Sequence, residues 1–215
     1  MNNKALVWAD LETGGLNGRL PNEQLGMEYY PILEVAIIVT DENLVEQGDP
    51  LRIAIHQPES EIEKCHEWAL KKHTESGLLD EVRLSSINLV QAQNMILDHL
   101  KWLGIDAYDR EAKTGGILCG SSIMFDRTYL MAQMPELHEY LHYRQLDVSA
   151  INLAMRMFNP DLAEQATDFK KYTHEALPDI RESIEELRIY RTKMLQNDFV
   201  MVPLLSMDQV IKKYT

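Results

Sequence analysis

Four acidic residues and one histidine, in three separated segments, have side chains that could do chemistry together. The segments read VWADLE, MFDRTYL and THEALPDI, and the residues are Asp10, Glu12, Asp126, His174 and Asp179. Carboxylate oxygens are the ligands that hard divalent cations prefer. An imidazole with a pKa near neutrality can accept a proton from water. The set therefore supplies ligands for two divalent cations and a general base for hydrolysis.

Each segment is weak evidence when it is taken alone. A D-x-E pair is common in solvated loops, an acid at a helix start is favoured by the helix dipole, and a lone histidine is more often structural. At a strand end, residues two apart point to the same face of the sheet. Asp10 and Glu12 would there repel each other unless a cation lay between them. The combination of all three segments is what indicates a metal-dependent site.

The spacing of apolar residues predicts an α/β fold around these segments. Runs rich in β-branched residues and bounded by turn residues predict strands at 4–10, Ile32–Thr40, Arg52–His56 and Ile117–Cys119. Apolar spacings of three and four, together with proline positions, predict helices at 59–70, Leu89–Leu103, Phe125–Met134, Val148–Phe158 and Pro178–Leu195.

Size and composition favour one catalytic domain with a short extension. The 215 residues are 45% hydrophobic and 26% charged, as in a typical globular protein, and they contain no repeat or Gly/Ser linker. We expect a domain at 1–193 and an extension at 194–215. Cys65 and Cys119 lack the spacing of a zinc site and are expected to be reduced core thiols. Without a leader pattern or a membrane-spanning run, the expected location is the cytoplasm.

The net charge constrains the length of a nucleic-acid substrate. At −13, the chain has no global positive field to hold long DNA or RNA through many phosphate contacts. Divalent cations can invert the local field, so a short ligand could still be bound at a few basic residues.

The segments VWADLETGGL, GSSIMFDRTYL, HYRQLDVS and THEALPDIRES resemble the motifs of DEDDh 3′→5′ exonucleases, in the form that oligoribonucleases carry them. The resemblance runs from residue 5 to about 192. It implies a ribonuclease H-like fold, in which a mixed β-sheet is flanked by α-helices. It also implies two Mg²⁺ or Mn²⁺ ions held by the four acids, His174 as the general base, and short single-stranded RNA cut to 5′-mononucleotides. Short DNA stays open as a substrate.

The same resemblance implies residues that bind substrate. Ser122, Arg144 and Ser149 would cap a 5′ phosphate. A second group would wedge or stack against bases, namely Leu16, Trp68, His73 and Tyr143. Tyr143 would reach across from a second subunit, which implies a homodimer. The alternatives are core packing for Trp68 and Tyr143 and a surface ion pair for Arg144.

The chain departs from the family pattern at three places. Gly14 stands where threonine is usual, the segment Asn17–Pro31 is longer than its counterpart, and the chain continues beyond about Lys193. The longer segment keeps a rival open, a broader DEDDh exonuclease acting on single-stranded DNA or longer RNA. A rival from another class is an inactive binding module that keeps the fold.

Overall fold

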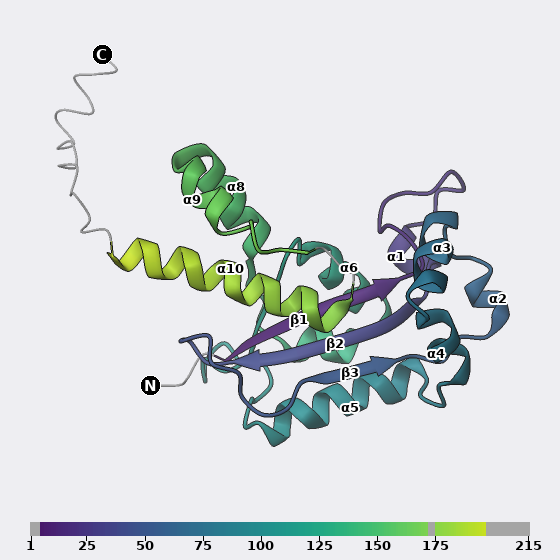
Figure 1. Ribbon diagram of the computed structural model, residues 1–215. Helices are drawn as coiled ribbons and strands as arrows, with labels where there is room; N and C mark the ends of the chain where they lie inside the picture. The colour runs from purple at the N-terminus through teal and green to yellow at the C-terminus, as the bar shows by residue number, and fades with distance from the viewer. Residues whose placement is uncertain (1–4, 172–174, 197–215) are drawn as a thin grey trace, which may run out of the picture.

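The computed structural model describes residues 5–171 and 175–196, which fold around a mixed five-stranded sheet (Figure 1). The strand order is β3-β2-β1-β4-β5. β2 is antiparallel to β1 and to β3, whereas β4 is parallel to β1 and to β5. The strands are β1 Leu6–Thr13, β2 Ile32–Thr40, β3 Leu51–Ala54, β4 Ile117–Gly120 and β5 Gln145–Asp147. This arrangement confirms the expected mixed sheet flanked by helices.

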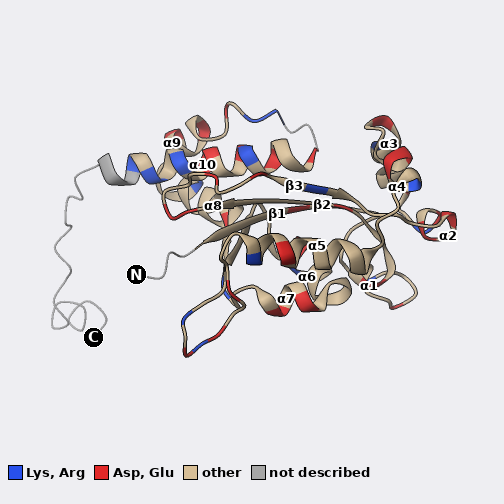
Figure 2. Ribbon diagram, turned by 90° about the horizontal axis from the view of Figure 1, so that it is seen from below, with Lys and Arg blue, Asp and Glu red and all other residues tan. Residues whose placement is uncertain are grey.

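Helices cover both faces of the sheet, as Figure 2 shows edge-on. One face carries α10 (Ala176–Gln196) and α8 (Val148–Phe158), beside the short α9 (Pro160–Gln165). The other face carries α5 (Leu89–Trp102), α6 (Met124–Gln133) and α7 (Pro135–Tyr140). Four shorter or peripheral helices lie toward the end where β1 finishes: α1 Gly26–Tyr29, α2 Glu59–Ile62, α3 Glu67–Glu75 and α4 Leu78–Leu84.

The alternation of side chains along β1 divides the core between the two faces. Val7, Ala9 and Leu11 pack on the side of α5 and α6, whereas Leu6 and Trp8 pack on the side of α10. Because successive residues point to opposite faces, the same alternation turns the acids at positions 10 and 12 toward α10. Every residue of β2 is buried, as expected for a strand covered on both faces.

The elements predicted from the sequence agree with the structure where the apolar pattern is long. Ile32–Thr40 and Val148–Phe158 have the predicted bounds, and the helix predicted at Leu89–Leu103 ends one residue earlier. Cys65 and Cys119 are free and buried, as predicted. No helix among the described residues is long and apolar enough to cross a membrane.

Other predictions were wrong or incomplete. The single helix predicted at 59–70 is two helices, α2 and α3, because the chain turns at Cys65 and His66. There the His66 backbone N–H donates to the carbonyl of Gly14, 2.6 Å away, and its side chain caps α3. The first strand continues through both acids to Thr13 rather than ending at the first. The short elements α1, α4, α7, α9 and β5 were not predicted. The division at residue 193 stays a prediction, since 197–215 lie outside the described residues.

Candidate active site

Three elements bring the four predicted acids to one end of the sheet. Asp10 and Glu12 lie on β1, on the face that α10 covers. Asp126 lies in the first turn of α6, and its Oδ1 accepts the backbone N–H of Leu11 at 2.9 Å. Asp179 lies in the first turn of α10 and lines, with Asp10, a cavity of about 120 Å³. The hydrogen bond at Leu11 ties α6 to β1 between the two acids of the strand.

Burial and mutual repulsion raise the pKa values of these carboxyls. Burial, followed by the charges of Asp179 and Glu34, raises the pKa of Asp10 to about 7. Burial raises the pKa of Glu12 to about 9, and the charge of Asp10 is the next cause. Burial, then the charge of Asp10, raises the pKa of Asp126, while the Leu11 N–H opposes that shift. The charges of these acids therefore interact strongly with one another.

The donor set fits hard divalent cations. All four side chains offer carboxylate oxygens, and bound cations would supply the missing positive charge. Within residues 5–171 and 175–196, however, no three His, Cys, Asp or Glu side chains lie close enough together to hold a metal ion as they stand. The predicted base, His174, lies outside the described residues.

A fifth acid that the sequence analysis missed lies beside this cluster. Glu34 of β2 is 2% exposed and directly opposite Glu12 in the antiparallel register. Its Oε2 is 2.5 Å from Nη2 of Arg52, whose Nη1 donates to Glu81 at 2.7 Å. Burial still raises the pKa of Glu34, although Arg52 opposes the shift. An acid inside the otherwise apolar run ILEVAIIVT was the signal that could have identified it.

A basic residue that was also missed lies on the other side of Asp10. Lys170 lines the same 120 Å³ cavity as Asp10 and Asp179. Its Nζ is 2.5 Å from Oε2 of Glu186, and both side chains are almost fully buried. Glu186 also accepts hydrogen bonds from Asn152 and Tyr190. The ion pair between Lys170 and Glu186 thus joins the segment before α10 to that helix.

A pocket of about 630 Å³ adjoins the acids and contains three of the four residues predicted to contact bases; Tyr143 does not line it. Leu16, Trp68 and His73 line it together with Glu12 and Phe125. Trp68 is 60% exposed, so core packing is excluded as its role. His73 is buried, with Nε2 3.0 Å from the carbonyl oxygen of Thr13 and Nδ1 3.9 Å from Glu12. The pocket therefore offers apolar and aromatic surface directly beside a carboxylate of the cluster.

The residues predicted to cap a 5′ phosphate are partly assembled. The backbone N–H of Ser122 donates to Asp147 Oδ1 at 3.1 Å and to Ser149 Oγ at 3.0 Å, and the two serine hydroxyls are 3.2 Å apart. Asp147 also caps α8 and was not predicted as part of this group. Arg144 lies over the ring of Tyr143, with its Cζ 5.4 Å from the centroid, rather than in an ion pair with a described acid. Tyr143 is 58% exposed, which excludes core packing.

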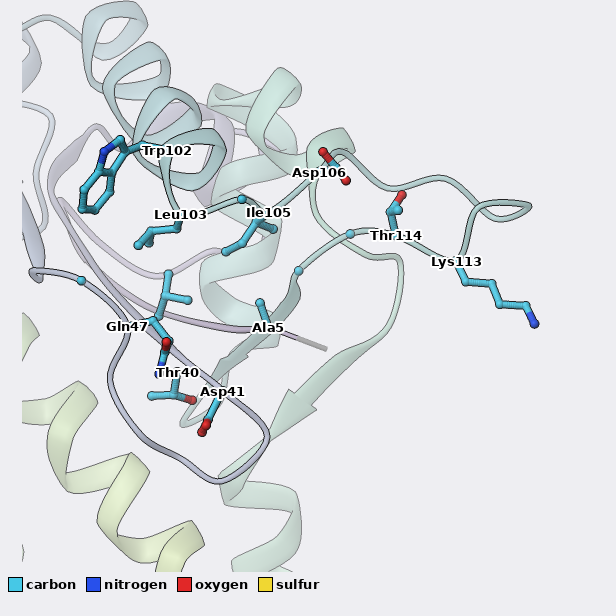
Figure 3. Close-up of a pocket in the computed structure, with 15 residues that line it drawn as sticks. Ala5, Thr40, Asp41, Gln47, Trp102, Leu103, Ile105, Asp106, Lys113 and Thr114 are labelled. Atoms are coloured by element: carbon cyan, nitrogen blue, oxygen red, sulfur yellow. The ribbon is translucent and has the colours of Figure 1, made fainter. Parts of the chain in front are cut away.

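Another hollow, of about 410 Å³, lies at the opposite end of β1 and does not have the features of a catalytic site (Figure 3). Trp102 and Lys113 on its rim point away from it, and Asp41 and Asp106 lie on separate loops and do not converge. The cluster at the other end of the sheet is therefore the candidate active site.

Comparisons with known proteins agree with this geometry. The family model RNase_T, described as exonuclease, matches residues 7–187. The oligoribonuclease of Haemophilus ducreyi is 39% identical over 197 residues, covering 90% of this chain and 96% of that protein. The oligoribonuclease of Vibrio parahaemolyticus is 40% identical over 187 residues, covering 86% of this chain and 93% of that protein.

Solved structures show the same fold at low sequence identity. Exonuclease I of E. coli in complex with an oligonucleotide superposes with a TM-score of 0.66 at 14% identity, over 90% of this chain and 42% of that one. Exonuclease I of Methylocaldum szegediense gives a TM-score of 0.64 at 17% identity, over 89% of this chain and 41% of that one. By its sequence relatives, its family model and its fold, the chain belongs to the oligoribonuclease family of exonucleases.

Proposed function

We propose that this protein hydrolyses short oligoribonucleotides from the 3′ end, down to dinucleotides, and releases 5′-mononucleotides. The observation that carries the proposal is the junction of four interacting carboxylates with the 630 Å³ pocket at Glu12. A terminal nucleoside seated in that pocket would have its 5′ phosphate next to the acids. The net charge of −13 favours short ligands over long ones.

The residues of the chain divide the catalytic work. Asp10, Glu12, Asp126 and Asp179 would hold two divalent cations, Mg²⁺ or Mn²⁺. When bound, such ions activate water and stabilise the leaving 3′ oxygen. His174 would accept the proton of the attacking water. Burial of the acids keeps their field strong, because charges interact more strongly away from bulk water.

Two surfaces would bind the ends of the substrate. Leu16 and Trp68 would pack against the terminal base, since stacking contributes about 1–3 kcal/mol per base. Ser122, Ser149 and Arg144 would bind the 5′ phosphate, where a guanidinium can make two parallel hydrogen bonds. A dinucleotide satisfies both surfaces at once, whereas a longer chain must displace one of them.

We also propose that the protein is a two-fold symmetric homodimer. Helix α8 buries only Val148 among its described residues, and Leu153, Met157 and Phe158 are 60%, 66% and 77% exposed. A contiguous apolar surface of this kind is typical of a protein interface. Tyr143, which lies just before β5, would extend from this region into the partner's cleft.

The first prediction concerns catalysis. Asp10→Ala, Asp126→Ala and Asp179→Ala should each abolish hydrolysis, and His174→Ala should lower kcat by about 10²–10⁴-fold with little change in KM. Product chromatography on labelled RNA and DNA, with Mg²⁺ or Mn²⁺, measures both. The control is Asp98→Asn, because the Asp98 side chain is exposed on α5 and forms an ion pair with Lys101. Near-normal hydrolysis by any of the three alanine variants would contradict the proposal. So would a wild-type protein that hydrolyses neither RNA nor DNA.

The second prediction concerns charge strain in the metal-free protein. Because the pKa of Asp10 rises to about 7 on folding, the folded state binds more protons than the unfolded state, and stability falls as pH rises from about 4 to 7. Asp10→Asn removes this penalty. In EDTA at pH 8 it should raise the free energy of unfolding by on the order of 4 kcal/mol, with little effect at pH 4.

Urea denaturation at both pH values measures this effect, with Asp98→Asn as the neutral control. Added Mn²⁺ should stabilise the wild type at pH 8 more than Asp10→Asn, because a ligand that binds only the folded state raises its stability. A metal-free Asp10→Asn protein that is less stable than the wild type at pH 8 would show that the cluster is not strained.

The third prediction concerns substrate length. Arg144→Ala removes a charge-assisted contact, so the affinity for 5′-phosphorylated dinucleotides should fall by about ten- to hundredfold, with longer chains less affected. Fluorescence anisotropy in a His174→Ala background measures the affinities, and Arg110→Ala, in an exposed loop, is the control. If the unmodified protein degrades twenty-nucleotide chains as fast as dinucleotides, it is instead a broader exonuclease that acts on longer chains.

The fourth prediction concerns assembly. Sedimentation at micromolar concentration should show a dimer, and Phe158→Glu should dissociate it, because a charge cannot be buried unpaired in an apolar interface. Val90→Glu places the same charge at an exposed position of α5 and should leave the dimer intact. A fully active wild-type monomer would refute this assembly.

A further inference from the structure

The long segment after Leu16 is folded on itself rather than open. We call residues 17–30 the brace. Arg19 forms an antiparallel bridge with Leu25, and the backbone N–H of Leu20 donates to the carbonyl of Gln24 at 2.9 Å. The N–H of Gly26 donates to the carbonyl of Gly18 at 2.8 Å, at the start of α1. The brace is therefore a small hydrogen-bonded unit.

Helix α6 holds the brace at both of its ends. The side-chain amide of Asn17 donates to Thr128 Oγ1 at 3.0 Å. At the other end, Nε2 of Gln133 donates to the carbonyls of Met27 and Tyr30 at 2.7 and 2.8 Å. Because α6 also carries Asp126, the brace and the acid cluster share one rigid support.

Leu16 is positioned through its backbone and not by its own side chain, which is 76% exposed. On one side, the hydroxyl of Tyr129 donates to the carbonyl of Gly15 at 2.7 Å and approaches that of Gly26 at 3.4 Å. On the other side, Gly26 packs so closely that a Cβ there would lie 1.8 Å from the carbonyl oxygen of Leu16. A backbone contact of this kind cannot be relieved by rotating a side chain.

The brace also forms part of the pocket wall. Gly18, Arg19 and Leu20 line the 630 Å³ pocket together with Trp68 and His73. Figure 1 shows the segment, in purple, at the end of the molecule where β1 finishes and α3 also lies. The extra length of this chain therefore closes the pocket on one side and does not open the cleft.

We propose that the brace is the specificity-determining wall of the nucleotide pocket: it fixes Leu16 through Gly26 and Tyr129 and so determines how tightly the 3′-terminal nucleoside is bound. This inference rests on the proposed function for the identity of the ligand. Gly26 and Tyr129 are positioning residues, because they act through Leu16. Their loss should weaken nucleoside binding and leave the chemistry at the acids intact.

Two ester substrates separate these effects. The p-nitrophenyl ester of thymidine 5′-monophosphate presents a nucleoside to the pocket, whereas bis(p-nitrophenyl) phosphate presents none. Gly26→Ala and Tyr129→Phe should raise KM for the first ester by about five- to tenfold, as expected for the loss of one or two hydrogen-bond equivalents, with kcat nearly unchanged. Neither should alter hydrolysis of the second ester by more than about twofold.

The matched control is Glu28→Ala, which also introduces alanine into α1 but at an exposed position. It should leave the hydrolysis of both esters unchanged. Tyr129→Phe keeps the ring in place, so it tests the inference even if Gly26→Ala does not fold. Equal KM values for all variants would overturn the inference. An equal loss on both esters would also overturn it, since that result indicates damage to the acid cluster.

Affinity for the product distinguishes failure of this inference from failure of the proposed function. Calorimetric titration with uridine 5′-monophosphate should show the same five- to tenfold weakening in Gly26→Ala and Tyr129→Phe. If the wild type binds the mononucleotide but hydrolyses neither RNA nor the esters, the proposed activity is wrong, and these affinities alone test the role of the brace. Unchanged affinities in the two variants would refute that role.

Discussion

The repulsion among four carboxylates at one end of a sheet is the constraint around which this structure is organised. Asp10 is held by the pairing of β1 with two neighbours, Asp126 by the hydrogen bond to Leu11, and Asp179 by the packing of α10 across β1 and β2. Strand pairing and core packing fix the backbone positions of Asp10 and Asp179, whereas the carboxylate of Asp126 is held by the hydrogen bond that it accepts itself. Apolar burial on both faces of the sheet supplies the free energy that keeps these acids together.

Other charged residues surround the cluster. Glu34 lies opposite Glu12 on the neighbouring strand, and its negative charge helps to raise the pKa values of Asp10 and Glu12, although Arg52 forms an ion pair with it. Lys170 lies in the cavity beside Asp10, held by Glu186. Both basic residues are thus bound to an acid outside the cluster. The cluster itself keeps an excess of negative charge, which is the condition that divalent cations satisfy.

Much of the fold could be predicted because local and tertiary preferences agree. The run Ile32–Thr40 is continuous and β-branched, so its bounds are sharp, and α8 begins after Asp147, which caps it through its side chain. The strand β5 has three residues and no pattern of its own, since it exists only by pairing with β4. The break between α2 and α3 depends on a hydrogen bond from His66 to Gly14, a distant position that no local pattern reveals.

The acids of the site could be identified from the sequence, whereas their supports could not. Asp10 and Glu12 follow from strand alternation and from the resemblance to known exonucleases. Glu34 had a local signal, an acid inside an apolar strand, but its pairing with Arg52 could not be predicted, and neither could the pairing of Lys170 with Glu186. Gly14 is explained only in three dimensions: a Cβ there would lie 2.6 Å from the sulfur of Cys65 and 2.9 Å from Pro31. The threonine usual in the family would not fit against those neighbours.

The docking of α10 across β1 and β2 has a consequence for how the protein is made. Asp10 comes from β1 and Asp179 from α10, the last helix among the described residues, so the two meet only after nearly all of the described chain is available. During synthesis from the N-terminus, β1 and β2 can pair early as neighbours, while the parallel partner β4 and the covering helix arrive later. A nascent or truncated chain would therefore carry its first acids in an incomplete site. Competence for hydrolysis would appear only once α10 has packed against the sheet.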